Sequence, residues 1–200
     1  MSNSENTILG LKLPTDPRWA NLAAISLEDI LSDHAYCEQK AASNCISLIQ
    51  KYPEYTRLVE ELSPIVTEEW GHFRMVLSEM KKRNLRLGTQ RKDEYVNALM
   101  DHMAKGGRPE LRFLDRLLVF ALIEARSCER FRLLSEGLED DYLKDFYRKF
   151  MISEAGHYRL FLDLAKEYCE EEMVMNRWAE WLQIEKKVLA GLEIRGDRMH

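Results

Sequence analysis

A six-residue motif that occurs twice in this chain carries side chains able to bind metal. It reads EWGHFR at 69–74 and EAGHYR at 154–159, so both copies have the form Glu-x-Gly-His-aromatic-Arg. On a helix, residues three positions apart lie on the same face. Each copy therefore offers one carboxylate and one imidazole to the same metal ion. Two copies predict two metal ions, which indicates a dinuclear metal enzyme.

A further glutamate precedes each copy by a similar distance, and each lies in an apolar helical stripe. Glu38 comes 31 residues before Glu69, and Glu124 comes 30 residues before Glu154. A diiron helical bundle takes one Glu from each of two helices and a Glu-x-x-His from each of the other two. The predicted metal ligands are therefore Glu38, Glu69, His72, Glu124, Glu154 and His157.

The charge of this ligand set favours two divalent cations. Four carboxylates and two neutral imidazoles carry −4, and four inward carboxylates without metal would face a large desolvation penalty. Pairing with Arg126, Arg130 or Arg132 is the competing explanation, but these arginines lie mostly off the stripe of Glu124. Mixed carboxylate and imidazole ligands favour iron over manganese, whereas zinc more often recruits thiolates.

Three nearby residues are candidates for supporting roles. Glu129 competes with Glu124, because Cys128-Glu129 has the same dipeptide as Cys37-Glu38. Its helical neighbours include arginines, which indicates a mixed surface, so Glu129 is assigned beside the ligands or on the substrate side. His34 and Glu68 lie next to ligand positions and could orient them. Glu129 lies only 25 residues before Glu154, against 31 in the first pair, so spacing favours Glu124, and nothing in the sequence beyond spacing separates the two.

Apolar periodicity and Pro or Gly stops predict an all-α protein. Long helices are expected at 26–52, 55–82, 109–136 and 140–169, with shorter ones at 93–104 and 171–192. Residues 117, 120, 121, 128 and 131 should face inward, and Trp178 and Trp181 should pack outside the bundle. We expect a loosely ordered segment at 1–17 and one domain at 18–200. Since Gly inside a helix costs about 1 kcal/mol relative to Ala, Gly71 and Gly156 indicate close packing beside the site.

Composition excludes several classes of protein. The 200 residues are 46% hydrophobic with a net charge of −5, which is unlike a general nucleic-acid binder. No apolar run approaches the roughly 18 residues of a membrane span, and the first ten residues lack a signal-peptide pattern. We therefore expect a cytoplasmic protein without a membrane partner. The four cysteines have no C-x-x-C spacing and are expected to be reduced.

The charge is uneven along the chain, however. Residues 81–92 hold six cations and no acidic residue. The helix dipole explains cations at the end of a helix but not the continuing run. This segment predicts a local contact with phosphate groups, made by Lys81, Lys82, Arg83, Arg86, Arg91, Lys92 and the later Arg108.

Four segments of the chain resemble the signatures of a known family. They are DHAYCEQKAA at 33–42, EEWGHF at 68–73, IEARSCERF at 123–131 and SEAGHY at 153–158, of which the third is the most specific. From about residue 11 to 192, the chain is similar to the tRNA 2-methylthio-N6-isopentenyladenosine hydroxylases. That family consists of ferritin-like nonheme diiron monooxygenases.

This resemblance implies a ferritin-like four-helix bundle with additional short and C-terminal helices. It also implies O2-dependent hydroxylation of the isopentenyl side chain on a modified adenosine next to the anticodon. The six predicted ligands would hold two iron ions, and the basic segment would contact the anticodon stem-loop of tRNA. No flavin, nicotinamide or iron–sulfur motif is visible, so electrons must come from an external donor. Small size and a charged surface permit a monomer.

Two other classes of function remain open from the residues alone. One is an iron-handling protein, either ferritin-like or a rubrerythrin-like peroxidase. The chain lacks the paired C-x-x-C site of rubrerythrins, and its two His ligands are more symmetric than a typical storage centre. The other is a metal-free helical module that uses the basic segment for interaction.

Overall fold

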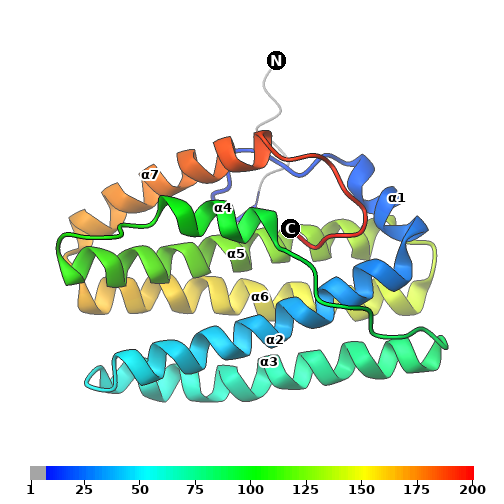
Figure 1. Cartoon of the computed structure of the whole chain (residues 1–200), viewed down its shortest axis with the longest axis horizontal. Coiled ribbons are helices and arrows are strands. Elements are labelled where there is room, and N and C mark those ends of the chain that lie inside the picture. The colour runs from blue at the N-terminus through cyan, green and yellow to red at the C-terminus, as the bar shows by residue number, and fades with distance from the viewer. Residues whose placement is uncertain (1–7) are drawn as a thin grey trace. The chain divides into compact units, whose positions relative to one another are not determined.

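The protein is almost entirely helical. The computed structural model describes residues 8–200, which form seven helices and no strand (Figure 1). This confirms the all-α prediction. The helices are α1 (Arg18–Ile25), α2 (Leu27–Lys51), α3 (Thr56–Lys82), α4 (Glu94–His102), α5 (Pro109–Gly137), α6 (Asp141–Tyr168) and α7 (Glu171–Ala190). Across residues 8–200, none of these helices combines the length and apolar character needed to cross a bilayer.

The contacts group the chain into two compact units, where the sequence predicts a single domain at 18–200. The α2–α3 unit comprises residues 21–92 and 195–199. The α5–α6 unit comprises residues 8–20, 93–194 and His200. Within the first unit α2 runs beside α3, and within the second α5 runs beside α6 (Figure 1). Each unit is thus built on one pair of long helices.

Local sequence signals place the ends of these helices close to the predicted positions. Asp93 caps α4 by accepting the backbone N–H of Val96, and Asp140 caps α6 by accepting two backbone N–H groups. Pro109 begins α5, where its missing N–H costs nothing. Such side-chain caps satisfy backbone donors that a helix leaves unpaired at its start.

Helix α5 is buried on nearly every side, which explains why its inward face is hard to define from sequence. The five positions predicted to face inward are buried, namely Leu117, Phe120, Ala121, Cys128 and Phe131. Arg126 and Glu129 are buried too. Since α5 contacts α4, α6 and α7, it is the central helix of its unit. The expected mixed surface around Glu129 is therefore wrong.

Part of the N-terminal segment makes buried contacts that the sequence does not indicate. The prediction of a loose segment covers residues 1–17, of which 1–7 lie outside the described residues. In the remaining part, Leu11 and Thr15 are buried, and Thr15 bonds to Glu129 through its backbone N–H and its hydroxyl. Helix α1, which follows at once, is not predicted. Its eight residues are too short to give a clear period.

Helix α7 contributes to the core of the α5–α6 unit and contacts α4, α5 and α6. Trp181 is fully buried, and its indole Nε1 donates to Asp115 Oδ1 at 2.8 Å. Arg177 donates to both oxygens of the same carboxylate at 2.6 and 2.9 Å. The expectation that Trp178 and Trp181 lie outside the bundle therefore fails for Trp181, which is a core residue of its own unit.

Candidate metal centre

The α2–α3 unit brings three of the predicted ligands together. Glu38 comes from α2, while Glu69 and His72 come from one turn of α3, and their ligand atoms lie within 4.8 Å of one another. His72 Nδ1 is 3.3 Å from Glu38 Oε2 and 3.4 Å from Glu69 Oε2. Both carboxylates are buried. We call these three residues the first half-site.

The α5–α6 unit repeats the arrangement with the other three ligands. Glu124 comes from α5, and Glu154 and His157 come from one turn of α6, again with ligand atoms within 4.8 Å of one another. His157 Nδ1 lies 3.6 Å from Glu154 Oε2. All three side chains are buried. These residues form the second half-site.

The spacing and chemistry of each half-site fit a metal ion. Two donors bound at about 2.1 Å to one ion, at roughly a right angle, are about 3 Å apart. The histidine Nδ1 lies 3.4 Å from a glutamate oxygen in the first half-site and 3.6 Å in the second. A small side-chain rotation would therefore bring both atoms to the distances of metal ligands. Each half-site carries −2 when its imidazole is neutral, which is the charge that one divalent cation balances.

His34 supports the first half-site, as its position in the sequence indicates. Its Nε2 lies 2.7 Å from Glu38 Oε1, one helical turn away, and the imidazole is fully buried. With Glu38 ionised, as a metal ligand would be, its carboxylate only accepts, so His34 Nε2–H would donate the hydrogen bond to Oε1. Glu38 Oε2 then remains directed at His72. Glu68 is half-exposed and approaches His72 Nε2 only to 3.9 Å.

Cys128 is a neutral thiol beside the second half-site. Burial and the charge of Glu154 raise its pKa to about 12. The thiol donates to the carbonyl of Met151 at 3.3 Å. All four cysteines are free in the structure. Cys128 is thus packed as a small core residue rather than held as a reactive thiolate.

Glu129 belongs to a different cluster from Glu124. Arg126 donates to the Glu129 carboxylate through Nη1 and to Glu185 Oε1 through Nε and Nη2, at 3.0 and 2.6 Å. All three side chains are buried. Glu129 also accepts the Thr15 hydroxyl at 2.6 Å. The structure therefore groups Glu124 with Glu154 and His157, and it places Glu129 in an ion-pair cluster.

The glycines of the repeated motif do not serve close packing. Within residues 8–200, no atom outside the local helix lies within 4 Å of a Cβ built at Gly71 or Gly156. The expectation that a crowded cluster excludes a side chain there is wrong. Both glycines thus weaken their helices without a packing gain in the described structure.

We expect Gly156→Ala to stabilise the metal-free protein by about 0.5–1 kcal/mol, because Ala favours the helix and the space is open. Urea unfolding measures the change from the shift of the midpoint, when the m-value of the variant equals that of the wild type. Gly137→Ala is the matched control, since a Cβ there would come 3.3 Å from the Cβ of Ala20 and should bring no such gain. Destabilisation by Gly156→Ala would mean that another group occupies the open space.

The basic segment is only partly available for phosphate. Arg83 Nε donates to Glu79 Oε1 at 2.6 Å, and Lys82 Nζ lies 3.6 Å from Glu79 Oε2. Arg91 pairs with Asp29 and, at 2.8 Å, with Asp197. The pairs of Glu79 with Lys82 and Arg83 follow helical spacing, so they can be predicted from the sequence. The pair of Arg91 with Asp197 cannot, because the two residues are far apart in the sequence. Four of the seven predicted cations are exposed and hold no side-chain ion pair among residues 8–200: Lys81, Arg86, Lys92 and Arg108.

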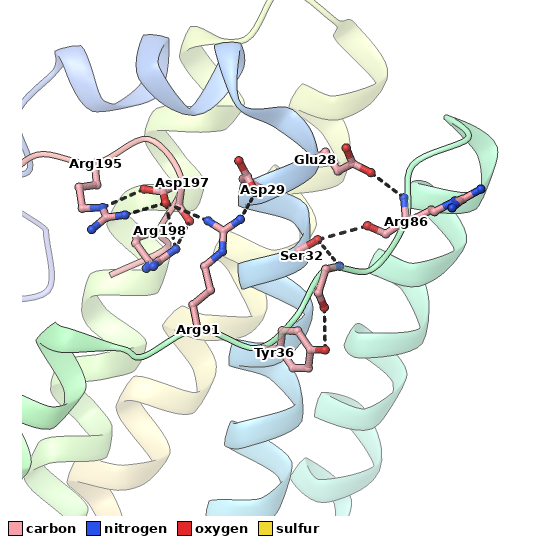
Figure 2. A network of polar contacts seen from close by, with 10 residues as sticks. Glu28, Asp29, Ser32, Tyr36, Arg86, Arg91, Arg195, Asp197 and Arg198 are labelled. Atoms are coloured by element: carbon pink, nitrogen blue, oxygen red, sulfur yellow. Dashed lines mark hydrogen bonds and ion pairs between the residues drawn. The ribbon is translucent and has the colours of Figure 1, made fainter.

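Residues 84–92, which we call the connector, follow α3 as an extended segment that α2 side chains hold in place (Figure 2). Glu28 Oε1 accepts the Arg86 N–H at 2.9 Å, and Ser32 Oγ accepts the Gly88 N–H at 3.1 Å. Tyr36 donates its hydroxyl to the Gly88 carbonyl at 2.9 Å. These α2 residues recur every four positions, so one helix face satisfies the backbone of the connector.

Ser32→Ala should therefore loosen the connector, at a cost of about 0.5–1.5 kcal/mol for the lost hydrogen bond. Amide hydrogen exchange at Gly88 is expected to become faster. Ser43→Ala on the same helix is the control, since that hydroxyl bonds only to the Gln39 carbonyl within its own helix. Equal exchange at Gly88 in both variants would show that Ser32 does not hold the connector.

Comparison with solved structures tests the fold class. The chain is similar to "Protein 43 with aldehyde deformylating oxygenase activity" from Synechococcus, with a TM-score of 0.89 and 36% identity, covering 96% of each chain. This similarity confirms the predicted class, a ferritin-like four-helix bundle with additional short and C-terminal helices.

Comparison with curated proteins finds two hydroxylases. The chain is 38% identical over 161 residues to tRNA 2-(methylsulfanyl)-N(6)-isopentenyladenosine(37) hydroxylase of Pseudomonas putida, covering 80% of this chain and 77% of that protein. It is 28% identical over 218 residues to the hydroxylase of the same name from Salmonella typhimurium, covering 82% and 77%.

A family model provides the widest coverage. The model described as tRNA-(MS2IO6A)-hydroxylase (MiaE) matches residues 3–200, a range that includes both half-sites and the connector. Neither this match nor the curated relatives favour the alternative of an iron-storage protein or a peroxidase. The resemblance noted from four short segments is confirmed, and the chain belongs to the tRNA-(MS2IO6A)-hydroxylase family.

Proposed function

We propose that this protein is a tRNA-modifying monooxygenase. It hydroxylates the isopentenyl side chain of 2-methylthio-N6-isopentenyladenosine next to the anticodon, with O2 as the oxidant. The observation that carries the proposal is the family match over residues 3–200, because that range includes both Glu-x-x-His motifs and their partner glutamates. Hydroxylation consumes one O2, two electrons and two protons, and it yields the alcohol and water.

The proposed cofactor is a pair of iron ions held by the two half-sites together. Glu38, Glu69 and His72 would supply three ligands, and Glu124, Glu154 and His157 the other three. Equal ligand content, equal Glu-x-x-His spacing and a charge of −2 in each half-site support this assignment. When bound, the iron pair would supply the O2 chemistry that attacks an allylic C–H bond, with electrons from an external donor.

The protein residues around the ligands position them and hold protons. His34 would donate a hydrogen bond from Nε2–H to Glu38 Oε1, which leaves Oε2 directed at the metal position beside His72. Cys128 keeps its proton on Sγ because burial and Glu154 raise its pKa to about 12. The four ligand carboxylates are buried, so bulk water would have little access to the metal position.

The proposed partners follow from the substrate. The anticodon stem-loop of tRNA would be contacted by the exposed cations Lys81, Arg86, Lys92 and Arg108, since phosphate contacts position an RNA without reading its sequence. An external donor would supply the electrons. We further propose that the protein acts as a monomer in the cytoplasm, where its tRNA substrate is found.

A direct assay tests the function. The iron-loaded protein is incubated with reductant, isotopically labelled O2 and tRNA that carries the methylthio-isopentenyl nucleoside, and the nucleosides are then analysed by mass spectrometry. We expect a hydroxylated nucleoside whose new oxygen comes from O2, and none without O2. Protein that holds two iron ions per chain but yields no product would overturn the proposal.

A second candidate activity comes from the Synechococcus protein. Its identity of 36% over 96% of both chains is close to that of the Pseudomonas hydroxylase, yet its name gives an aldehyde deformylating oxygenase activity. The same iron-loaded sample should therefore be offered an aldehyde in place of tRNA. Turnover of the aldehyde with no hydroxylated nucleoside would favour this second activity.

A further inference from the structure

Trp70, in the first copy of the repeated motif, has an indole ring that is unusually open to solvent. Its exposed fraction is 47%, although it directly follows the buried ligand Glu69. The ring is held in place by the buried Phe73, with a centroid separation of 4.9 Å. The other three tryptophans, Trp19, Trp178 and Trp181, are buried, and an interaction partner would explain why this one is exposed.

The repeated motif shows that metal binding does not require this indole. Both copies keep the Glu, Gly, His, aromatic and Arg positions, but Ala155 stands in the second copy where Trp70 stands in the first. The second half-site nevertheless gathers its three ligands as the first one does. The grouping of the ligands therefore does not explain why the first copy carries a tryptophan at this position.

Two cations lie on the same face of α3 as Trp70. Arg74 follows at i+4 and Lys81 at i+11, which is close to three full helical turns from Trp70. Both side chains are exposed, and neither forms an ion pair or a side-chain hydrogen bond with any of residues 8–200. The face thus presents one aromatic ring and two available cations along about 16 Å of helix, at 1.5 Å per residue.

We infer that this face of α3 binds the single-stranded anticodon loop, with an unpaired nucleobase stacked on Trp70 and with phosphates at Arg74 and Lys81. Aromatic rings interleaved with cations bind single-stranded nucleic acid, because rings stack on bases while cations follow the backbone. The Cα of Trp70 is only about 3.8 Å from that of Glu69. A base held there would lie beside the turn of α3 that supplies Glu69 and His72. This inference rests on the proposed function, and it adds a nucleobase contact to the phosphate contacts.

Trp70→Ala tests the inference with the residue that the second copy already carries. We expect unchanged iron content and unchanged helicity, together with a Kd for the anticodon stem-loop RNA raised about 5- to 150-fold, the effect of losing one stacked base. The KM for tRNA should rise more than kcat falls. Trp70→Phe should recover part of the affinity. Met75→Ala, an exposed residue on another face of α3, should bind RNA as the wild type does.

The salt dependence of binding separates stacking from charge. Trp70→Ala should leave the slope of log K against log salt unchanged, whereas Arg74→Ala and Lys81→Ala should each lower it by about one. Unchanged RNA affinity in Trp70→Ala, beside an active wild type, overturns this inference and leaves the proposed function intact. Loss of iron, or dissociation of a wild-type dimer, in Trp70→Ala would overturn it as well. An inactive wild type would instead count against the proposed function.

Discussion

Glu124→Gln is expected to lower hydroxylation by more than about 100-fold and to reduce bound iron below two ions per chain. Even a residue that only supports a metal ligand contributes about 10- to 100-fold, so a direct ligand should contribute more. Gln keeps the size of Glu but loses the charge that binds the cation. Iron per chain by metal analysis and product formation from modified tRNA measure the two effects.

Glu129→Gln is the matched control on the same helix. Glu129 bonds to Arg126 and Thr15, so its loss should leave iron at two ions per chain. Its effect should instead appear as a loss of stability of about 1.5–3 kcal/mol, the range for a hydrogen bond to a charged group. If Glu129→Gln loses iron while Glu124→Gln retains it, the assignment of Glu124 as a metal ligand is wrong.

The long helices could be predicted from sequence because their signals are local. Period-3.6 apolar stripes with Pro, Gly and Asp at the ends place α3 at 55–82, against Thr56–Lys82 in the structure. Helix α1 is missed because its eight residues span only about two turns, which is too short for a periodic apolar pattern to be recognised. The contact of Thr15 with Glu129 joins residues 114 positions apart, and no local pattern reports such a contact.

Among the predicted ligands too, contacts within one helical turn can be predicted from sequence, whereas contacts between helices cannot. Glu69 and His72 follow from spacing within one helical turn, since side-chain direction on a helix is fixed by position. The dipeptides Cys37-Glu38 and Cys128-Glu129 are identical in sequence. Glu38 nevertheless belongs to the first half-site, whereas Glu129 pairs with Arg126. On a helix buried on most sides, periodicity does not show which partner a charged residue has.

Arg126→Ala should cause the largest loss of stability among the substitutions considered. The guanidinium donates to Glu129, Glu185, the Thr15 hydroxyl at 3.1 Å and the Leu13 carbonyl at 2.9 Å. Burial lowers the pKa of Arg126, but the charges of Glu185 and Glu129 outweigh it, and the pKa is raised above its usual value. Removing one member of a buried ion cluster leaves the others uncompensated and costs about 3–5 kcal/mol. Denaturant unfolding of the metal-free protein measures this loss.

Arg130 is a second buried arginine on α5, close enough to Arg126 for the two charges to repel each other. Its guanidinium lies 4.8 Å from the Trp19 ring centroid, and burial together with the Arg126 charge lowers its pKa to about 10. Arg148→Ala is the control for charge removal in the same unit, because its pair with Asp145 is exposed and should contribute at most about 1 kcal/mol. Equal losses in Arg126→Ala and Arg148→Ala would show that the buried cluster does not hold the N-terminal segment and α7 onto α5. A much larger loss in Arg126→Ala, with both half-sites still able to take up iron after refolding, would separate this cluster from the metal centre on the same helix.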